Sequence, residues 1–140
     1  MGAANWTVDS TCKPGIVMLR LSGTFSEGEM RAFVAAHNTA IDDLHGSDYK
    51  VFCDIRDLTP LSPEVAETFE HAKRHSSRQK NFRGSAVLTT SAVVALQHRR
   101  TSITSGVMNT ELISDDERAC WEHLKNVYRG SSARDDSDST

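Results

Sequence analysis

The chain has 140 residues, the usual size of one domain, and 38% of them are hydrophobic while 25% are charged. Its formal net charge of −3 argues against a protein that binds polyanions through overall charge. No apolar run approaches the roughly 20 residues of a membrane-spanning helix, and the N-terminus does not have the pattern of a secretory signal. These properties predict one globular domain in the cytoplasm.

The first elements predicted along the chain are two strands and a helix. Residues 5–12 alternate between apolar and polar side chains, and residues 16–21 are nearly all apolar. The turn between them, Lys13-Pro14-Gly15, makes the pair an antiparallel hairpin. Ser26 and Glu29 have the spacing of a capping box, and apolar residues then recur at the spacing of a helix.

Three further strands follow, and helices separate them. Apolar runs at 51–55, 86–88 and 112–113 predict the strands. Ser62, followed by Pro63, has the pattern of a residue that caps the start of a helix, with proline in the first turn. The helix after the first of these strands is therefore expected to begin at Ser62.

Two more helices are predicted near the end of the chain. One is capped by Thr90 or Ser91 and runs to about Thr104. Its inward-facing apolar residues are expected to be Val93, Leu96 and Ile103. The segment from Ser114 to Glu117 has the form of a second capping box and starts the last helix. The apolar side of that helix is expected to comprise Cys120, Trp121, Leu124, Val127 and Tyr128.

The predicted order of elements is ββαβαβαβα. Alternating helices and apolar strands indicate an α/β fold with right-handed crossovers. We expect a mostly parallel sheet of about five strands, with an N-terminal antiparallel hairpin and about four helices. The domain is assigned to residues 5–128, after a flexible N-terminus at 1–4. Residues 129–140 consist mainly of Ser, Asp, Arg and Gly and are expected to be disordered.

The cysteines and histidines do not predict a metal centre. Cys12, Cys53 and Cys120 are far apart and lack C-x-x-C spacing, which argues against disulfides and zinc and favours a reducing compartment. Cys53 lies in a predicted strand and Cys120 on an apolar helix face, so both are expected to be buried and inert. His71 and His75 have metal-ligand spacing, but no Cys or acidic residue follows for more than thirty residues. We therefore expect no bound metal.

Three charged residues follow the predicted central strand. Asp54, Arg56 and Asp57 lie at its carboxyl end, the edge where open α/β sheets bind ligands. On one interpretation they form a polar pocket, in which Arg56 binds an anion and a carboxylate orients a partner. On the other they form a local ion pair and cap a nearby turn.

The basic residues are unevenly distributed along the chain. Residues 71–110 contain no Asp or Glu and have a net charge of +7, whereas the rest of the chain has −10. The seven basic residues of this block are Lys73, Arg74, Arg78, Lys80, Arg83, Arg99 and Arg100. Such segregation indicates a docking surface for an acidic partner, a phosphate group or a membrane face. We expect all of them except Lys80, together with Arg56 and Asp57, to bind the partner or anion. Alternatively, the block is not one patch in space, and its cations lie at helix C-termini.

Nucleic acid and membranes are not the expected partners. Phe82 is the single aromatic residue among these basic residues, so a platform for stacking bases is missing. No helix carries a recognisable DNA-reading motif. The helix predicted over residues 63–80 has Phe69 but few other bulky anchors, so membrane binding is not expected either.

Three segments resemble the STAS superfamily, specifically its SpoIIAA-like branch. They are IVMLRLSG at 16–23, VFCDIRDL at 51–58 and DDERACWEHL at 115–124, and the resemblance runs over about 5–128. It implies a non-enzymatic regulatory module. Members of that branch include anti-anti-sigma factors that are switched by phosphorylation of a serine in a D-S-S-G stretch. That stretch is absent here, but Ser62 falls at or one position from the acceptor and is a possible phosphoacceptor.

The sequence contains no glycine-rich phosphate loop, no H-E-x-x-H and no nucleophile elbow. With the resemblance, this predicts a non-catalytic cytoplasmic regulatory or scaffold module that binds a protein partner in bacterial signalling, without a cofactor. One alternative is a small-ligand or lipid-binding domain that uses the basic block 71–110. Another is an enzyme in which His98, beside Arg99 and Arg100, faces Asp54. A homodimer is also possible through the edge of the hairpin, with Trp6 and Trp121 as anchors.

Overall fold

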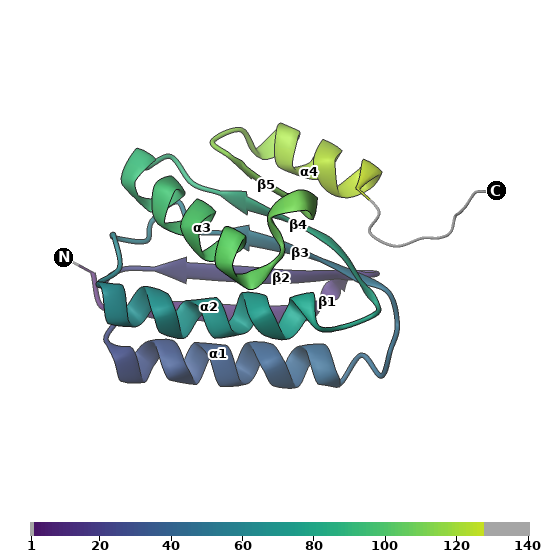
Figure 1. The fold of residues 1–140 in the computed structure, drawn as a ribbon, viewed down its shortest axis with the longest axis horizontal. Coiled ribbons are helices and arrows are strands. Elements are labelled where there is room, and N and C mark those ends of the chain that lie inside the picture. Colours follow the sequence, from purple (N-terminus) through teal and green to yellow (C-terminus); the bar gives the residue numbers. More distant parts are fainter. Residues whose placement is uncertain (1, 128–140) are drawn as a thin grey trace.

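A computed structural model describes residues 2–127, which form one mixed sheet flanked by helices (Figure 1). The elements in chain order are β1 (Asn5–Lys13), β2 (Ile16–Ser22), α1 (Glu27–Asp42), β3 (Tyr49–Asp54), α2 (Pro63–Ser77), β4 (Phe82–Leu88), α3 (Ala92–Ser105), the short 3-10 helix η1 (Met108–Thr110), β5 (Glu111–Ser114) and α4 (Glu117–Asn126). The predicted α/β class and element order are confirmed.

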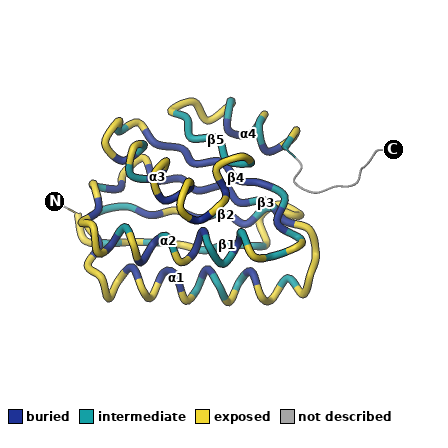
Figure 2. Tube along the Cα trace, in the orientation of Figure 1, coloured by how far each residue is buried: buried dark blue, intermediate teal, exposed yellow. Residues whose placement is uncertain are grey.

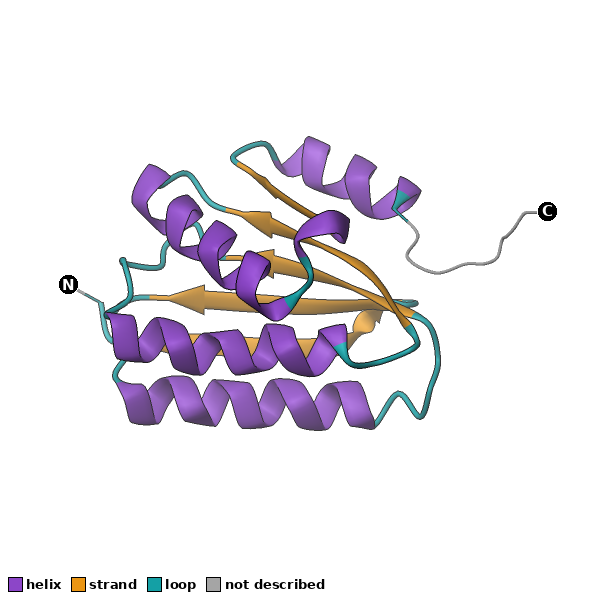
Figure 3. Cartoon of the chain, in the orientation of Figure 1, coloured by secondary structure: helices purple, strands orange, loops and turns teal. Residues whose placement is uncertain are grey.

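The strands lie side by side in the order in which they occur in the chain, β1-β2-β3-β4-β5. β1 is antiparallel to β2, and the other neighbouring pairs are parallel, as predicted. Each parallel crossover advances in the same direction across the sheet, so α1, α2 and α3 share one face (Figure 3). α4 follows the last strand and packs against β3, β4 and β5 on the opposite face.

Each face of the sheet has its own apolar cluster, because alternate side chains of a strand point to opposite faces. In β3, Val51 and Cys53 join the cluster beneath α1, α2 and α3, whereas Phe52 joins Leu88 and Cys120 beneath α4. Figure 2 shows the buried middle of the sheet between the more exposed outer turns of the helices. The main core therefore lies between the sheet and three helices, and a smaller core anchors α4.

Three of the predicted helix starts are confirmed, among them Ser91, whose Oγ accepts from the Val94 amide at 3.2 Å at the start of α3. Ser26 and Glu29 form the capping box: Ser26 Oγ accepts from the Glu29 amide at 3.2 Å, and Glu29 Oε1 accepts from the Ser26 amide at 2.8 Å. Ser62 Oγ accepts from the Val65 amide at 3.3 Å, with Pro63 in the first turn of α2. Each side chain satisfies a backbone donor that the helix itself leaves unpaired.

The predicted start of the last helix is wrong by two residues. Ser114 belongs to β5, and its Oγ accepts from the Asp116 amide at 3.0 Å in a short turn. Asp116 caps α4 by accepting from the Arg118 amide at 3.0 Å. The helix ends at Asn126, so Val127 is its extended C-cap, and Tyr128 lies outside the described residues.

The predicted orientation of α3 is also wrong. Val93, Leu96 and Ile103 were expected to face the core, but they are 55%, 61% and 58% exposed. The buried residues of α3 are Val94, His98, Thr101, Ser102 and Ser105. Polar atoms turn inward here because α2 presents a buried lysine, Lys73, to them. Its Nζ donates to the carbonyl oxygen of His98 at 3.0 Å and to Oγ of Ser102 at 2.6 Å.

The first described residues lie against the end of β2. The Thr24 amide donates to the Gly2 carbonyl at 3.2 Å. Gly23 has φ +82°, and a Cβ there would lie 2.2 Å from the carbonyl oxygen of Ala3, so glycine is required.

The flexibility of residues 1–4 stays a prediction, and the tail at 129–140 lies outside the described residues. None of the helices within 2–127 is long and apolar enough to cross a membrane.

Candidate functional site

The carboxyl edge of the sheet is organised around Asp54, the last residue of β3. Its buried carboxylate accepts from Arg56 Nε at 3.1 Å and Nη2 at 2.8 Å, and from Arg20 Nη2 at 3.2 Å. Burial raises the pKa of Asp54, but the contacts with Arg56 and Arg20 outweigh it and hold the pKa below its usual value. Arg56 also lies 3.8 Å from Glu117 at the start of α4. Asp54 and Arg56 therefore form the local ion pair of the second interpretation.

The loop that follows β3 presents Asp57 and Ser62 at the same edge. Both residues are exposed, and the Asp57 carbonyl accepts from the Gly23 amide at 2.9 Å. The loop is also fixed to α3, because the Gln97 side chain binds both the amide and the carbonyl of Leu61, at 2.9 and 2.6 Å. The edge is therefore a defined surface with exposed polar side chains.

The basic residues of the block 71–110 are dispersed over several elements. Lys73 is buried and so does not belong to any surface. Arg74 pairs with Glu70, and Arg83 pairs with Asp48 at 2.9 Å. The exposed members lie at the end of α2 and on α3, and they are Arg78, Lys80, Arg99 and Arg100. Of the predicted anion-binding residues, Arg99 and Arg100 lie together on one exposed helix.

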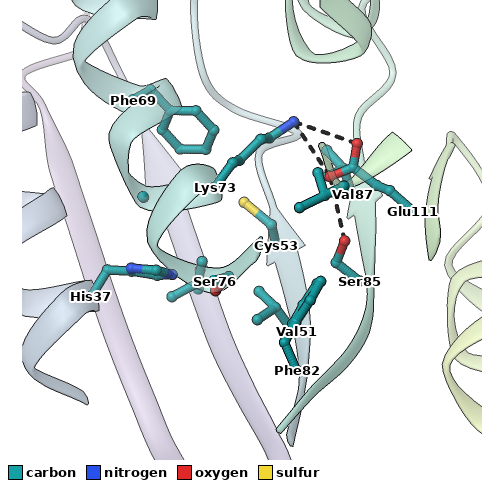
Figure 4. A pocket seen from close by; sticks show the side chains of 13 residues that line it. His37, Val51, Cys53, Phe69, Lys73, Ser76, Phe82, Ser85, Val87 and Glu111 are labelled. Atoms are coloured by element: carbon teal, nitrogen blue, oxygen red, sulfur yellow. Dashed lines mark hydrogen bonds and ion pairs between the residues drawn. The ribbon is translucent and has the colours of Figure 1, made fainter. Parts of the chain in front are cut away.

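Lys73 belongs to a buried polar cluster between α2, α3 and β5 (Figure 4). Its Nζ lies 3.3 Å from Glu111 Oε2, with the two side chains only 8% and 4% exposed. Ser102 donates to Glu111 Oε1, and Ser85 donates to Oε2 at 3.4 Å. Burial lowers the pKa of Lys73, while the Glu111 carboxylate opposes that change. The pair is well hydrogen-bonded, which a buried ion pair needs.

None of the predictions from the sequence includes this cluster, although a signal for it exists. Lys73 continues the buried positions of α2 at the spacing Val65, Phe69, Lys73. Glu111 is the first carboxylate after the basic block, at the start of a strand. The cavity beside the cluster measures about 30 Å³, room for a water molecule rather than a substrate.

The structure does not bring together the residues of the proposed enzyme site. The His98 ring is buried against Phe69, with ring centroids 4.7 Å apart. Arg99 and Arg100 lie on the exposed side of the same helix, and Asp54 binds Arg20 and Arg56 instead. Neither His98 nitrogen has a hydrogen-bond partner among the described residues. Burial and the nearby Lys73 charge hold the pKa of His98 well below its usual value.

The predicted histidine pair does not form a ligand cluster. His75 Nε2 lies 2.8 Å from Asp42 Oδ1, and His71 is exposed. Within the described part of the chain, no three metal-ligating side chains gather. Cys53 and Cys120 are buried, as predicted, and burial raises their pKa values to about 12 and about 11, so both thiols are protonated.

The two tryptophans expected to anchor a dimer contact the core of their own chain. Trp6 meets Phe33 edge-on, with centroids 5.9 Å apart. Trp121 stacks on Phe52, with centroids 4.5 Å apart. β1 does form an edge of the sheet, so pairing with a second copy stays a prediction.

No protein-family model matches the sequence, and no curated protein matches it significantly. A solved structure that is similar to this chain is an anti-sigma factor antagonist from Mycobacterium paratuberculosis, with a TM-score of 0.61 and 13% sequence identity. The match covers 89% of this chain and 96% of the antagonist. The described chain thus has a STAS-like fold, which it shares with that anti-sigma factor antagonist.

Proposed function

We propose that this chain is a non-catalytic, cytoplasmic regulatory module that binds a protein partner in bacterial signalling. The partner that we assign is an anti-sigma factor. The observation that carries the proposal is the fold shared with an anti-sigma factor antagonist over nearly the whole of both chains. The carboxyl edge supports it, since the buried Asp54 carboxylate is neutralised by Arg20 and Arg56, while exposed groups such as Asp57 and Ser62 face outward.

Ser62 is the residue through which we propose that binding is switched. It is exposed and caps α2. A phosphate there would add a charge of about −1.5 to −2, directly beside the positive N-terminal end of the α2 dipole. The added charge alters the surface charge of the carboxyl edge but does not enter the core. It should therefore change the affinity for the partner more than the stability of the fold.

The test measures binding of purified full-length chain to the anti-sigma factors of the same organism by isothermal titration calorimetry. The unmodified chain is expected to bind one of them, and Ser62→Glu to weaken that binding at least about tenfold. Ser62→Ala is expected to keep the affinity and to lower the free energy of unfolding by about 1 kcal/mol, because it removes the cap.

Ser47→Glu is the matched control, since Ser47 is exposed in the loop before β3, at the other end of that strand. It introduces the same charge and should leave the affinity unchanged. Absence of binding to every anti-sigma factor would contradict the proposed partner. Equal affinities of Ser62→Glu and Ser47→Glu would contradict the proposed switch.

A groove favours one version of the small-ligand alternative, in which the ligand is a small phosphorylated molecule rather than a lipid. It measures about 500 Å³, within the range of ligand pockets, and lies between the β1–β2 turn and α4. Four cationic side chains, a carboxylate and a tryptophan are among the residues that line it: Lys13, Lys50, Arg83, Lys125, Asp48 and Trp121. Asp48 pairs with Arg83, which leaves three lysines to attract an anion. This lining suits a small phosphorylated molecule. Lipid carriage has less support, because the 30 Å³ core cavity is far too small for an acyl chain.

Titration with ATP and with inorganic phosphate, followed by amide chemical shifts, tests this alternative. If it holds, the shifts gather around the groove, and Lys13→Glu/Lys125→Glu reduces ATP affinity at least about tenfold. Arg78→Glu/Lys80→Glu is the control with the same change of net charge. Shifts that are scattered, or equal effects of the two variants, would eliminate the groove as a ligand site.

A further inference from the structure

The outer face of α3 is apolar, although the helix has a polar inner face. Among the described residues, the large hydrophobic side chains that are exposed are Val93, Leu96, Ile103 and Met108. All of them lie on α3 or directly after it, rather than singly over the surface. A gathered apolar patch of this kind marks a contact surface more often than scattered residues do.

The spacing places these apolar side chains in one stripe along the helix, which Arg99 and Arg100 interrupt between Leu96 and Ile103. Val93, Leu96 and Ile103 follow one another at three and seven residues, which keeps them on one side of an α-helix. From Val93 to Ile103 the stripe extends about 15 Å along the helix axis. That length suits several turns of a second helix packed along α3.

Two arginines lie within the same face. Arg100 stands one turn from Leu96 and one turn from Ile103, and Arg99 lies beside it. Both arginines are exposed, and no carboxylate of the described residues pairs with either. α3 itself contains no Asp or Glu. The stripe is therefore both apolar and positive, and it requires acidic side chains in whatever covers it.

We propose that α3 is the docking surface for an acidic amphipathic helix of the partner protein. This inference rests on the proposed function and names the chemistry of the partner. Aliphatic side chains of that helix pack on Val93, Leu96 and Ile103, while its Asp or Glu residues pair with Arg99 and Arg100. Charge complementarity sets the orientation and the rate of association, and the apolar stripe supplies most of the buried area.

Other occupants fit this face less well. A second copy related by a two-fold axis would bring Arg99 and Arg100 of both copies together, and like charges oppose such an interface. An anionic membrane would meet a protein whose net charge is −3 and a stripe without aromatic anchors. The chain's own segment 128–140 has two arginines among its three aspartates and offers few apolar side chains.

The test uses two fluorescent, hydrocarbon-stapled helical peptides, because short free helices are marginal in water. Both carry leucines at the spacing i, i+3, i+7 and i+10. One peptide flanks them with glutamates and the other with lysines. Fluorescence polarisation with the full-length chain is expected to show the glutamate peptide binding at least about tenfold more tightly, with a preference that weakens as salt rises.

Two variants assign the binding to α3. Arg99→Glu/Arg100→Glu is expected to reverse the preference between the peptides, whereas Arg78→Glu/Lys80→Glu, at the C-cap of α2 and in the loop after it, is expected to keep it. Leu96→Ser is expected to weaken binding of the glutamate peptide at least about tenfold, since central apolar contacts contribute most of the affinity. These side chains are exposed, so the variants should fold like the unmodified chain.

The inference is overturned if the glutamate peptide does not bind, if both peptides bind equally, or if Arg78→Glu/Lys80→Glu has the same effect as Arg99→Glu/Arg100→Glu. It is also overturned if the chain instead cosediments with phosphatidylglycerol vesicles through Leu96, or if Leu96→Ser dissociates a homodimer.

Titrating Arg99→Glu/Arg100→Glu with the anti-sigma factor separates the two proposals. Unchanged affinity there rejects the α3 surface and retains the proposed function. Peptide binding to α3 without any anti-sigma factor binding rejects the assigned partner and retains the surface.

Discussion

Replacing Lys73 with methionine is expected to lower the free energy of unfolding by about 3–5 kcal/mol, because it leaves the carboxylate of Glu111 buried without its counter-ion. Two hydroxyl groups would still donate to that carboxylate, from Ser102 and Ser85, but neither carries a charge. Glu111→Leu should destabilise the fold for the converse reason. Urea denaturation monitored by circular dichroism measures both effects.

The double variant Lys73→Met/Glu111→Leu is expected to be more stable than either single variant, since it removes both charges from the interior. Arg74→Met is the matched control. Arg74 is the next residue of α2 and also pairs with a glutamate, but its side chain is 42% exposed, so its loss should cost less than about 1 kcal/mol. Additive effects of the two single variants would show that the pair does not act as a unit.

Stability is expected to fall between pH 7 and pH 5 because of two buried histidines. Burial lowers the pKa of His37 from its ordinary value of 6.5 to about 4, and His98 is also held well below 6.5. Both remain neutral in the folded chain but bind a proton in the unfolded chain as the pH falls through 6.5. The unfolded state is therefore favoured at acid pH, and His37 alone should reduce the unfolding free energy by about 2 kcal/mol over this interval.

Urea denaturation at the two pH values checks this expectation. Asn38 and Asp42 act to raise the pKa of His37, but burial, helped by the nearby His75, outweighs them. The acids with lowered pKa values, such as Asp54, lose their contribution only below about pH 4 and do not affect the interval. His37→Leu should flatten the dependence, and His98→Leu should flatten it further. His45→Gln, in an exposed loop, should not. If the unfolding free energy still falls between pH 7 and pH 5 when both histidines are replaced by leucine, the pH dependence does not come from His37 and His98.

The elements that the sequence predicted correctly are those whose signals are local. The capping box at Ser26, the proline after Ser62 and the turn at Lys13-Pro14-Gly15 each act within a few residues. Alternation and apolar runs placed the strands, because one or both faces of the sheet are buried. Of the predicted site, Asp54 and Arg56 were found together because they are two residues apart in the chain.

The orientation of α3 and the buried cluster depend on contacts that no local pattern contains. The apolar spacing of Val93, Leu96 and Ile103 is typical of a core-facing stripe. The opposite side of α3 faces the core instead. Lys73 on α2 needs the Ser102 hydroxyl and the His98 carbonyl of α3 as hydrogen-bond partners, so these polar groups turn inward. The separation of 38 residues between Lys73 and Glu111 hides their pairing in the same way. Similarly, the basic block is continuous in the chain but divided in space.

The strand order β1-β2-β3-β4-β5 has a consequence for what the carboxyl edge can bind. Doubly wound sheets bind nucleotides in a crevice that opens where the order of the strands reverses and adjacent helices leave on opposite faces. Here the order never reverses, and α1, α2 and α3 all leave on one side, while α4 leaves on the other side after the edge strand β5. The hollow at the carboxyl ends of β4 and β5 measures about 250 Å³, below the usual range of ligand pockets, so most of the edge is a shallow ledge of loops and helix N-termini. A ledge suits the broad, shallow contact of another folded protein better than the enclosure of a small molecule.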